Sequence, residues 1–264
     1  MKEILDAIIL GIVQGLTEFL PVSSSGHLEL MKFILGDKAV PEESLLMTVV
    51  LHFATALATV VVFRKEITRI IKGVFQIDNV EERQFAGKII VSMIPAVIVG
   101  LMFEKEIETL FSQNILLVCS MLLVTAALLF FASSRQGKEL PVTFRSSFLI
   151  GLAQAVAILP GVSRSGATIS AALILGVDRK EAASFSFLMV VPLIFGKMAK
   201  DFLDGSLIST SVNIPAMFTG FVAAFITGYL ACIWMIKIVR NSKLQIFAWY
   251  CVIIAMTGFL YIYA

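Results

Sequence analysis

Five stretches of the chain, each 15 to 21 residues long, contain no aspartate, glutamate, lysine or arginine. They lie at residues 46–63, 89–103, 115–132, 216–236 and 247–263. A helix needs about 20 apolar residues to cross the hydrocarbon core of a bilayer, so stretches of this kind predict membrane-spanning helices. We therefore expect an all-α polytopic membrane protein, with the lipid bilayer as its surroundings.

The composition supports this prediction and limits the classes of partner that the protein is expected to bind. Hydrophobic residues make up 58% of the 264 residues and charged residues only 15%, whereas roughly a quarter of a soluble domain is charged. The net charge of +2 is too small to indicate a nucleic-acid partner. Cys119, Cys232 and Cys251 lie in apolar stretches without a metal-binding pattern, so we expect small buried side chains. The sequence indicates one integral membrane domain over residues 1–264.

An internal repeat relates the two halves of the chain at an offset of 140 residues. Residues 11–26, GIVQGLTEFLPVSSSG, align with residues 151–166, GLAQAVAILPGVSRSG. The first glycine, the glutamine and the Ser-x-Ser-Gly positions coincide, and Ile-Leu-Gly at 34–36 aligns with 174–176. Shared polar and turn-forming residues at one offset indicate a duplication, with halves of about 1–140 and 141–264.

Each half begins with two apolar segments that are too short to span a bilayer. A Pro/Ser/Gly turn interrupts each pair, and the segments are residues 4–20 and 27–36, then 146–159 and 167–177. Helices broken at matching positions point to a site near the membrane midplane, where irregular backbone survives only if protein buries it or it lines a cavity. We predict two re-entrant helical hairpins that meet at the bilayer midplane.

The number of spans and the charge distribution predict how the halves are oriented. Three spans follow each hairpin, six transmembrane helices in all, and an odd number per half gives an inverted-topology repeat. Most of the 21 lysines and arginines fall in the loops at 64–88, 135–145, 179–180 and 237–243. By the positive-inside rule these loops are cytoplasmic, and both termini then face outside.

The two turns contain five serines, which stand just before the second helix expected in each hairpin. They are Ser23, Ser24, Ser25, Ser163 and Ser165. Serine is a good N-cap, so two capped helices are the plain interpretation, but two caps need only two serines. Two helix N-termini that converge also bring free N–H groups and positive dipole ends together. Phosphate is the usual ligand of such a site.

Arg164 is the one basic residue that this topology assigns to neither side of the membrane. A charge inside the bilayer is costly and usually marks function. The planar guanidinium suits a phosphate held by two hydrogen bonds. The structural alternative is an ion pair with Glu18, and the two interpretations are compatible because an empty active site can hold that pair.

Three further polar side chains are candidates for chemistry, and a fourth is not. Gln14 and Glu18 are four residues apart and share one helix face. Glu18 could act as a general base or bind a hard divalent cation such as Mg²⁺ or Ca²⁺. The imidazole of His27 suits proton transfer or attack on phosphorus. His52 stands alone in an apolar stretch, and we expect it to be packed and hydrogen-bonded.

The segments QGLTEFLPVSSSGH at 14–27 and PGVSRSGAT at 160–168 resemble the signatures of the undecaprenyl-diphosphate phosphatase family, known for bacitracin resistance. The family's Glu/Gln-x-x-x-Glu motif is matched by Gln14 and Glu18. Its Pro-Gly-x-Ser-Arg-Ser-x-x-Thr motif is matched throughout the second segment. The similarity runs over essentially the whole chain, including IPAVIVGLMF and FSFLMVVP.

This resemblance implies hydrolysis of undecaprenyl diphosphate to undecaprenyl phosphate and inorganic phosphate, which recycles the carrier lipid of cell-wall synthesis. It also implies a divalent cation (Mg²⁺ or Ca²⁺) and an active site open to the outer face of the bacterial cytoplasmic membrane. Carried over by position, the catalytic group is Glu18, Ser24, His27 and Arg164, with Glu18 also the metal ligand. The residues expected around the diphosphate are Gln14, Ser23, Ser25, Ser163, Ser165 and Thr168. Many relatives have glutamate at the position of Gln14, so Glu18 is the principal carboxylate here.

Ser24 is the favoured nucleophile, assisted by Glu18 or His27, while attack by His27 or by water stays open. A transporter or flippase of the prenyl phosphate lipid is the alternative function, because inverted repeats with broken helices are also a transporter architecture. A second lipid-phosphatase superfamily has a histidine after its Ser-Arg pair, but Ser170 stands six residues after Arg164, which argues against it. Oligomeric state, including a homodimer, and prenyl chain length are left open.

Overall fold

The computed structural model describes residues 2–35, 41–76, 78–110, 114–135, 139–203, 213–241 and 243–263. All regular structure in these residues is helical, apart from an isolated β-bridge between Leu140 and Val177, which confirms the all-α prediction. The helices are α1 (Lys2–Phe19), α2 (Ser24–Leu35), α3 (Pro41–Val62), α4 (Arg64–Phe75), α5 (Val80–Met102), α6 (Glu104–Leu110), α7 (Ile115–Ser133), α8 (Phe144–Val156), α9 (Arg164–Ile174), α10 (Arg179–Leu203), α11 (Ile214–Arg240) and α12 (Gln245–Tyr263).

Five of these helices are long and apolar enough to cross a membrane, namely α5, α7, α10, α11 and α12. A sixth span results if α3 and α4 are counted together, although they are bent by 78° at Phe63. The structure therefore gives five or six candidate spans where six are expected. Many of their large apolar side chains are exposed, as the surface of a protein in lipid requires.

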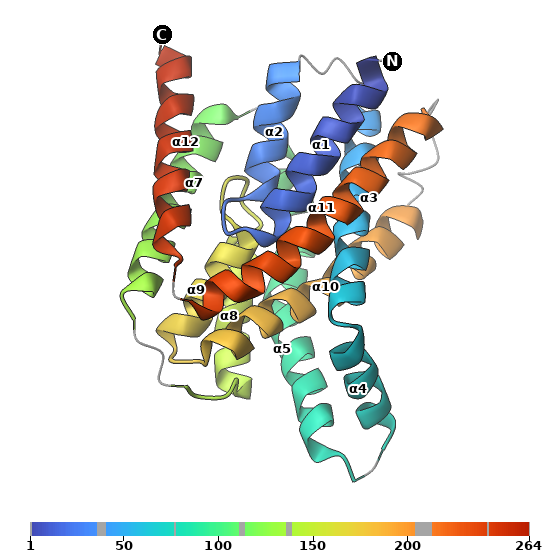
Figure 1. Cartoon of the computed structure of the whole chain (residues 1–264), viewed down its shortest axis with the longest axis vertical. Helices are drawn as coiled ribbons and strands as arrows, with labels where there is room; N and C mark the ends of the chain where they lie inside the picture. Colours follow the sequence, from blue (N-terminus) through green and yellow to red (C-terminus); the bar gives the residue numbers. More distant parts are fainter. Residues whose placement is uncertain are drawn as a thin grey trace.

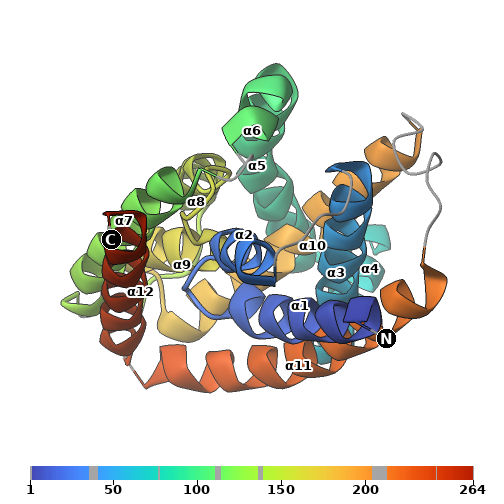
Figure 2. The same ribbon diagram turned by 90° about the horizontal axis from the view of Figure 1, so that it is seen from above.

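Two short helices, α2 and α9, lie in the middle of the molecule, and longer helices surround them. Seen from above, α2 and α9 occupy the centre, with α7 and α12 along one flank and α11 along another (Figure 2). Both chain ends lie at the same end of the molecule, and α4 with the start of α5 projects at the opposite end (Figure 1). The central position of α2 and α9 protects the polar turns that precede them.

The first helix of each half packs against a long helix of the other half. Helix α1 lies along α11, and α8 lies along α5. Gly15 permits the first contact, because a methyl group there would lie 2.7 Å from the carbonyl oxygen of Ala224. Gly151 permits the second, since it faces the backbone of Ser92 just as closely. Small residues at such crossings let helices pack in the absence of a hydrophobic effect.

The two expected helix breaks are present, but the helices after them begin earlier than predicted. The first turn occupies residues 20–23, so α2 begins at Ser24 rather than near residue 27. The second occupies residues 157–163, so α9 begins at Arg164 rather than at 167. Ser24 and Arg164 are thus the first residues of their helices. A serine immediately before each helix supplies the cap, so Ser24 and Arg164 are not needed as caps and lie in the first turn.

Candidate active site

The turn between α1 and α2 lies against the turn between α8 and α9, in the middle of the molecule (Figure 1). The Ser165 hydroxyl donates to the carbonyl oxygen of Leu20 at 3.2 Å across this contact. A methyl group added at Gly166 would lie 3.3 Å from Cβ of Pro21. The N-termini of α2 and α9 are therefore brought to one region, as the sequence predicts.

Two of the five serines cap these helix ends in matching fashion, and two more contact the capping hydroxyls. The Ser23 hydroxyl accepts from the N–H of Gly26 at 3.2 Å, and the Ser163 hydroxyl accepts from the N–H of Gly166 at 3.1 Å. Each capping hydroxyl also lies within 3.4 Å of the serine two residues on, Ser25 or Ser165. The plain interpretation of these serines as caps is thus correct for Ser23 and Ser163.

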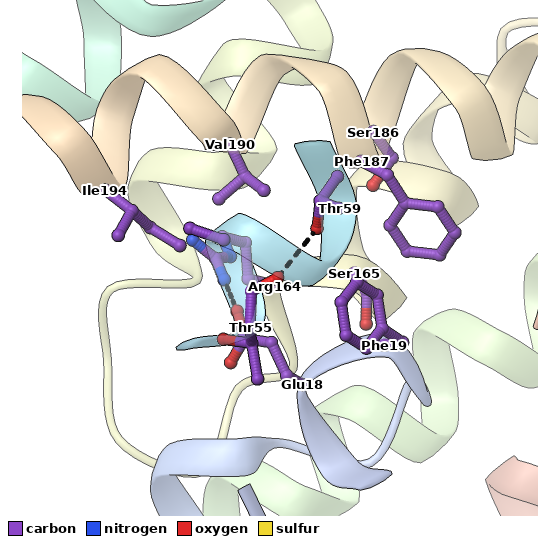
Figure 3. Close-up of a pocket in the computed structure, with 11 residues that line it drawn as sticks. Glu18, Phe19, Thr55, Thr59, Arg164, Ser165, Ser186, Phe187, Val190 and Ile194 are labelled. Carbon is purple, nitrogen blue, oxygen red and sulfur yellow. Dashed lines mark hydrogen bonds and ion pairs between the residues drawn. The ribbon is translucent and has the colours of Figure 1, made fainter. Parts of the chain in front are cut away.

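Ser24 differs from the other serines, because its hydroxyl donates to Oε2 of Glu18 at 2.7 Å. The same oxygen accepts from Nε2 of Gln14 at 2.9 Å, across one turn of α1. Oε1 of Glu18 forms an ion pair with Nη2 of Arg164 (Figure 3). The Glu18 side chain is only 4% exposed and that of Arg164 is 25% exposed. The two halves of the chain thus meet in a buried charge pair, which is the structural alternative raised for Arg164.

His52 approaches the same carboxylate, which sequence reasoning missed. Its Nδ1 lies 2.8 Å from the carbonyl oxygen of Thr48, so the expected hydrogen bond is confirmed. Its Nε2 lies 3.7 Å from Oε2 of Glu18, and this contact was not expected. The only signal was a polar side chain in an otherwise apolar span, which is a functional candidate by default.

His27 makes its hydrogen bonds away from the charge pair. Its Nδ1 lies 2.8 Å from the carbonyl oxygen of Ser23, and its Nε2 lies 2.9 Å from the hydroxyl of Tyr250 on α12. The two rings stack with their centroids 5.6 Å apart. Tyr250 is 223 residues away in the sequence, and no motif pointed to it.

Thr168 points into the helix packing behind the turn. Its hydroxyl bonds to the carbonyl oxygen of Arg164 at 2.8 Å and to the hydroxyl of Ser186 on α10 at 2.7 Å. It therefore lies one turn behind Arg164 and ties α9 to α10. In this position Thr168 supports Arg164 from behind, and its side chain does not extend past the arginine.

A small cavity of about 10 Å³ lies beside Glu18 and Arg164, with room for about one water molecule. Its polar lining residues are Thr55, Thr59, Ser165 and Ser186, together with the charge pair. Apolar side chains are interspersed among them, namely Phe19, Phe187, Val190 and Ile194 (Figure 3), together with Ala56. Charge next to apolar side chains suits a ligand that has a polar head on a hydrocarbon chain.

A divalent cation would need ligands from the substrate as well as the protein. Among the residues that the structure describes, no three His, Cys, Asp or Glu side chains form a metal cluster. However, Oε1 of Gln14 is buried without a hydrogen-bond partner, one turn from the Glu18 carboxylate. Mg²⁺ is often held by one or two carboxylates plus substrate phosphates. The residues present fit such a shared site.

Fold and site together define a helical membrane protein with a buried acid–arginine–serine centre at the meeting point of two broken helices. A family model described as "Bacitracin resistance protein BacA" matches residues 7–257. The chain belongs to this BacA family.

Three relatives illustrate the similarity, and each is named undecaprenyl-diphosphatase. The relative from Christiangramia forsetii is 58% identical over 262 residues, or 99% of either chain. The one from Bacteroides fragilis is 45% identical over 260 residues, or 96% of either chain. The one from Methanobrevibacter smithii is 38% identical over 274 aligned residues, which cover 98% of this chain and 97% of the relative.

Proposed function

We propose that this protein hydrolyses undecaprenyl diphosphate to undecaprenyl phosphate and inorganic phosphate. The three relatives are named for this activity, and the similarity to them covers nearly the full length of each chain. The observation in the structure that supports it best is the hydrogen bond from Ser24 to Glu18, beside Arg164 and a cavity lined in part by apolar side chains. A nucleophile, its base and a phosphate-binding cation are the parts that phosphoryl transfer requires.

The diphosphate is bound where the N-termini of α2 and α9 meet. Free N–H groups and the positive ends of two helix dipoles favour an anion there. Arg164 exchanges its resting ion pair with Glu18 for two hydrogen bonds to phosphate oxygens. Ser163, Ser165, Ser23 and Ser25 hold the two helix ends in place around the anion, and Thr168 anchors α9 behind Arg164.

Ser24 attacks the terminal phosphorus while Glu18 accepts the proton of its hydroxyl. The Ser24 oxygen–phosphorus bond forms as the bond to the bridging oxygen breaks, and undecaprenyl phosphate leaves with that electron pair. A water molecule then cleaves the phosphoserine and releases inorganic phosphate. Arg164 stabilises the charge that develops on the transferred group, which is usually the largest contribution to such reactions.

A divalent cation would be held by Glu18 and by Oε1 of Gln14, together with the phosphate oxygens. When bound, it supplies further neutralisation of charge on the diphosphate. Glu18 then remains the residue on which proton transfer depends, since an amide at position 14 cannot accept a proton at neutral pH.

We also propose that the chain is an inverted repeat with two re-entrant hairpins and six spans, in the bacterial cytoplasmic membrane. The reciprocal packing of α1 on α11 and of α8 on α5 supports the repeat, as do the matching serine caps. Lysines and arginines concentrated in alternate loops support cytoplasmic ends for α3, α7, α8 and α11. With this orientation, the active site opens to the extracytoplasmic side.

Phosphate release from prenyl diphosphates by the purified protein tests this function. We expect release from the C55 substrate with the wild-type chain, loss of release on addition of a chelator, and no release by Ser24→Ala. A lipid flippase would move a labelled prenyl phosphate across vesicles without releasing phosphate. That result would replace the hydrolase proposal with the transporter alternative.

A further inference from the structure

Ser23 has an unusual backbone conformation for a buried residue that is not glycine. Its φ is +70°, in the left-handed region, and the residue is 2% exposed. It stands directly before α2, in the N-cap position, where φ is ordinarily negative. Ser163 occupies the matching position before α9 and has φ −72°. A non-glycine residue keeps a strained conformation only when its surroundings hold it there.

The side chain of His27 adds a second hydrogen bond to a carbonyl oxygen of Ser23 that already accepts the first backbone bond of α2. The carbonyl oxygen of Ser23 accepts from the backbone N–H of His27 at 3.1 Å. It also lies 2.8 Å from Nδ1 of the same residue. Because a carbonyl oxygen can only accept, Nδ1 must carry a proton and donate to it.

Tyr250 forms a hydrogen bond with the other ring nitrogen of His27. In the neutral imidazole with a proton on Nδ1, Nε2 is an acceptor, so the Tyr250 hydroxyl donates to it at 2.9 Å. The stacked rings hold the imidazole in this orientation. Neither nitrogen of His27 is therefore directed at Ser24 or Glu18.

The second half of the chain shows what the turn does without a histidine. The repeat places Ala167 where the first half has His27. In that turn the left-handed residue is Gly161, with φ +96°. Glycine adopts this conformation without steric cost, so no side chain is needed to hold it.

We propose that His27 and Tyr250 are positioning residues: together they hold Ser23 in its left-handed conformation and thereby direct Ser24 at Glu18. The inference rests on the proposed function, because it assigns His27 a role in placing the nucleophile. His27 acts through the backbone of Ser23, and it is neither the nucleophile nor the base of the reaction.

A double-mutant cycle between positions 23 and 27 tests this role. His27→Ala should let Ser23 leave its strained conformation and should lower kcat roughly 5- to 100-fold, with little change in KM. This range corresponds to the free-energy cost of one strained backbone conformation. In a Ser23→Gly background the same replacement should lower kcat less than about threefold, because glycine needs no support. Ser23→Asn gives a second background, since asparagine tolerates the left-handed region and can still cap a helix. Equal losses of kcat in all backgrounds would show that His27 takes part in the chemistry.

Nitrogen NMR of ¹⁵N-histidine-labelled protein tests the geometry without any substrate. The chain has only two histidines, so the resonances of His27 can be assigned by their persistence in His52→Gln. We expect a neutral His27 with its proton on Nδ1, and an Nε2 resonance that shifts in Tyr250→Phe. Tyr261→Phe, at a 67% exposed position further along α12, is the matched control and should cause no shift. A His27 with its proton on Nε2 would overturn the proposal, whether or not the protein releases phosphate.

Discussion

Glu18 is the residue on which most interactions of the site converge. Its carboxylate accepts from Gln14 and Ser24, pairs with Arg164 and faces Nε2 of His52 at 3.7 Å. A carboxylate this deeply buried is stable only if it is paired and hydrogen-bonded. The same contacts keep it ionised, which is the form that the proposed mechanism requires of a base.

Replacement of Glu18 should therefore cost more than replacement of Gln14. Glu18→Gln keeps the shape of the side chain but removes the base, and kcat for phosphate release should fall at least about 100-fold. Gln14→Glu should retain activity, because the family motif accepts either residue. Kinetics on samples with matched thermal unfolding check both variants. Near-normal activity of Glu18→Gln together with an inactive Gln14→Ala would reverse the roles.

Arg164 should be needed for its shape as well as its charge. Arg164→Lys keeps a cation beside Glu18 but loses the planar fork, so the protein should fold while phosphate release falls about 100-fold or more. Full turnover by a folded Arg164→Lys would exclude the bidentate clamp.

Loss of the charge at position 164 should instead affect stability. Arg164→Met leaves the Glu18 carboxylate uncompensated and should destabilise the fold by about 3 kcal/mol or more. Arg164→Met with Glu18→Gln should recover most of that loss, because both buried charges are gone. Thermal unfolding in one detergent compares the three proteins.

At the scale of elements, the site depends on how closely α1 approaches α11. Helix α1 carries Gln14 and Glu18, and its glycines Gly11 and Gly15 let it lie directly against the backbone of α11. A displacement of α1 moves Glu18 relative to Arg164, which is fixed on α9. The packing of α1 against α11, beside the polar cluster, is thus expected to control the geometry of the cluster.

Gly15→Ala should therefore destabilise the protein and lower its activity. The added methyl group would overlap the Thr227 side chain and lie 2.7 Å from the backbone nitrogen of Gly228. Overpacking of this kind typically costs about 1–3 kcal/mol. Gly196→Ala on α10 is the matched control, because no atom lies within 4 Å of its added methyl group. Equal unfolding temperatures for the two variants would contradict the close contact.

At the scale of the whole molecule, the two halves of the chain interlock and share the site. Each half contributes its first helix to a surface formed by the other half, and α7 pairs with α12 across the repeat. Glu18 and Ser24 come from the first half, whereas Arg164 comes from the second. Neither half contains all three of these residues, so the candidate site exists only where the two halves meet.

Single cysteines at Lys72 and Lys105 should react with a membrane-impermeant reagent from opposite sides. Lys72 lies near the end of α4 and Lys105 in α6, at opposite ends of the span formed by α5. The native Cys119, Cys232 and Cys251 would first be replaced. Glu108 in the same helix is an alternative position for the second label, but its side chain lies outside the described part of the structure. Labelling of both cysteines from outside would contradict the inverted topology.

The amino-acid sequence by itself determined the class of fold and most of the polar cluster. Long uncharged stretches require helices in a membrane, because lipid offers no partners for backbone polar groups. Proline, serine and glycine at matching places located both breaks, and the spacing of Gln14 and Glu18 placed them on one helix face. These conclusions depend on composition and local spacing, which a sequence states directly.

Only the tertiary structure decided which distant side chains contact the candidate residues Glu18 and His27. His52 and Tyr250 stand in apolar spans without a motif, and their direction depends on how α3 and α12 pack. The left-handed Ser23 is likewise invisible in the sequence, because serine normally caps a helix with a negative φ. His27 holds Ser23 through a hydrogen bond, and Tyr250 in turn holds His27 through a contact between residues 223 positions apart in the sequence. Local rules predict what a residue prefers, whereas long-range packing determines which strained or unpaired groups the fold can support.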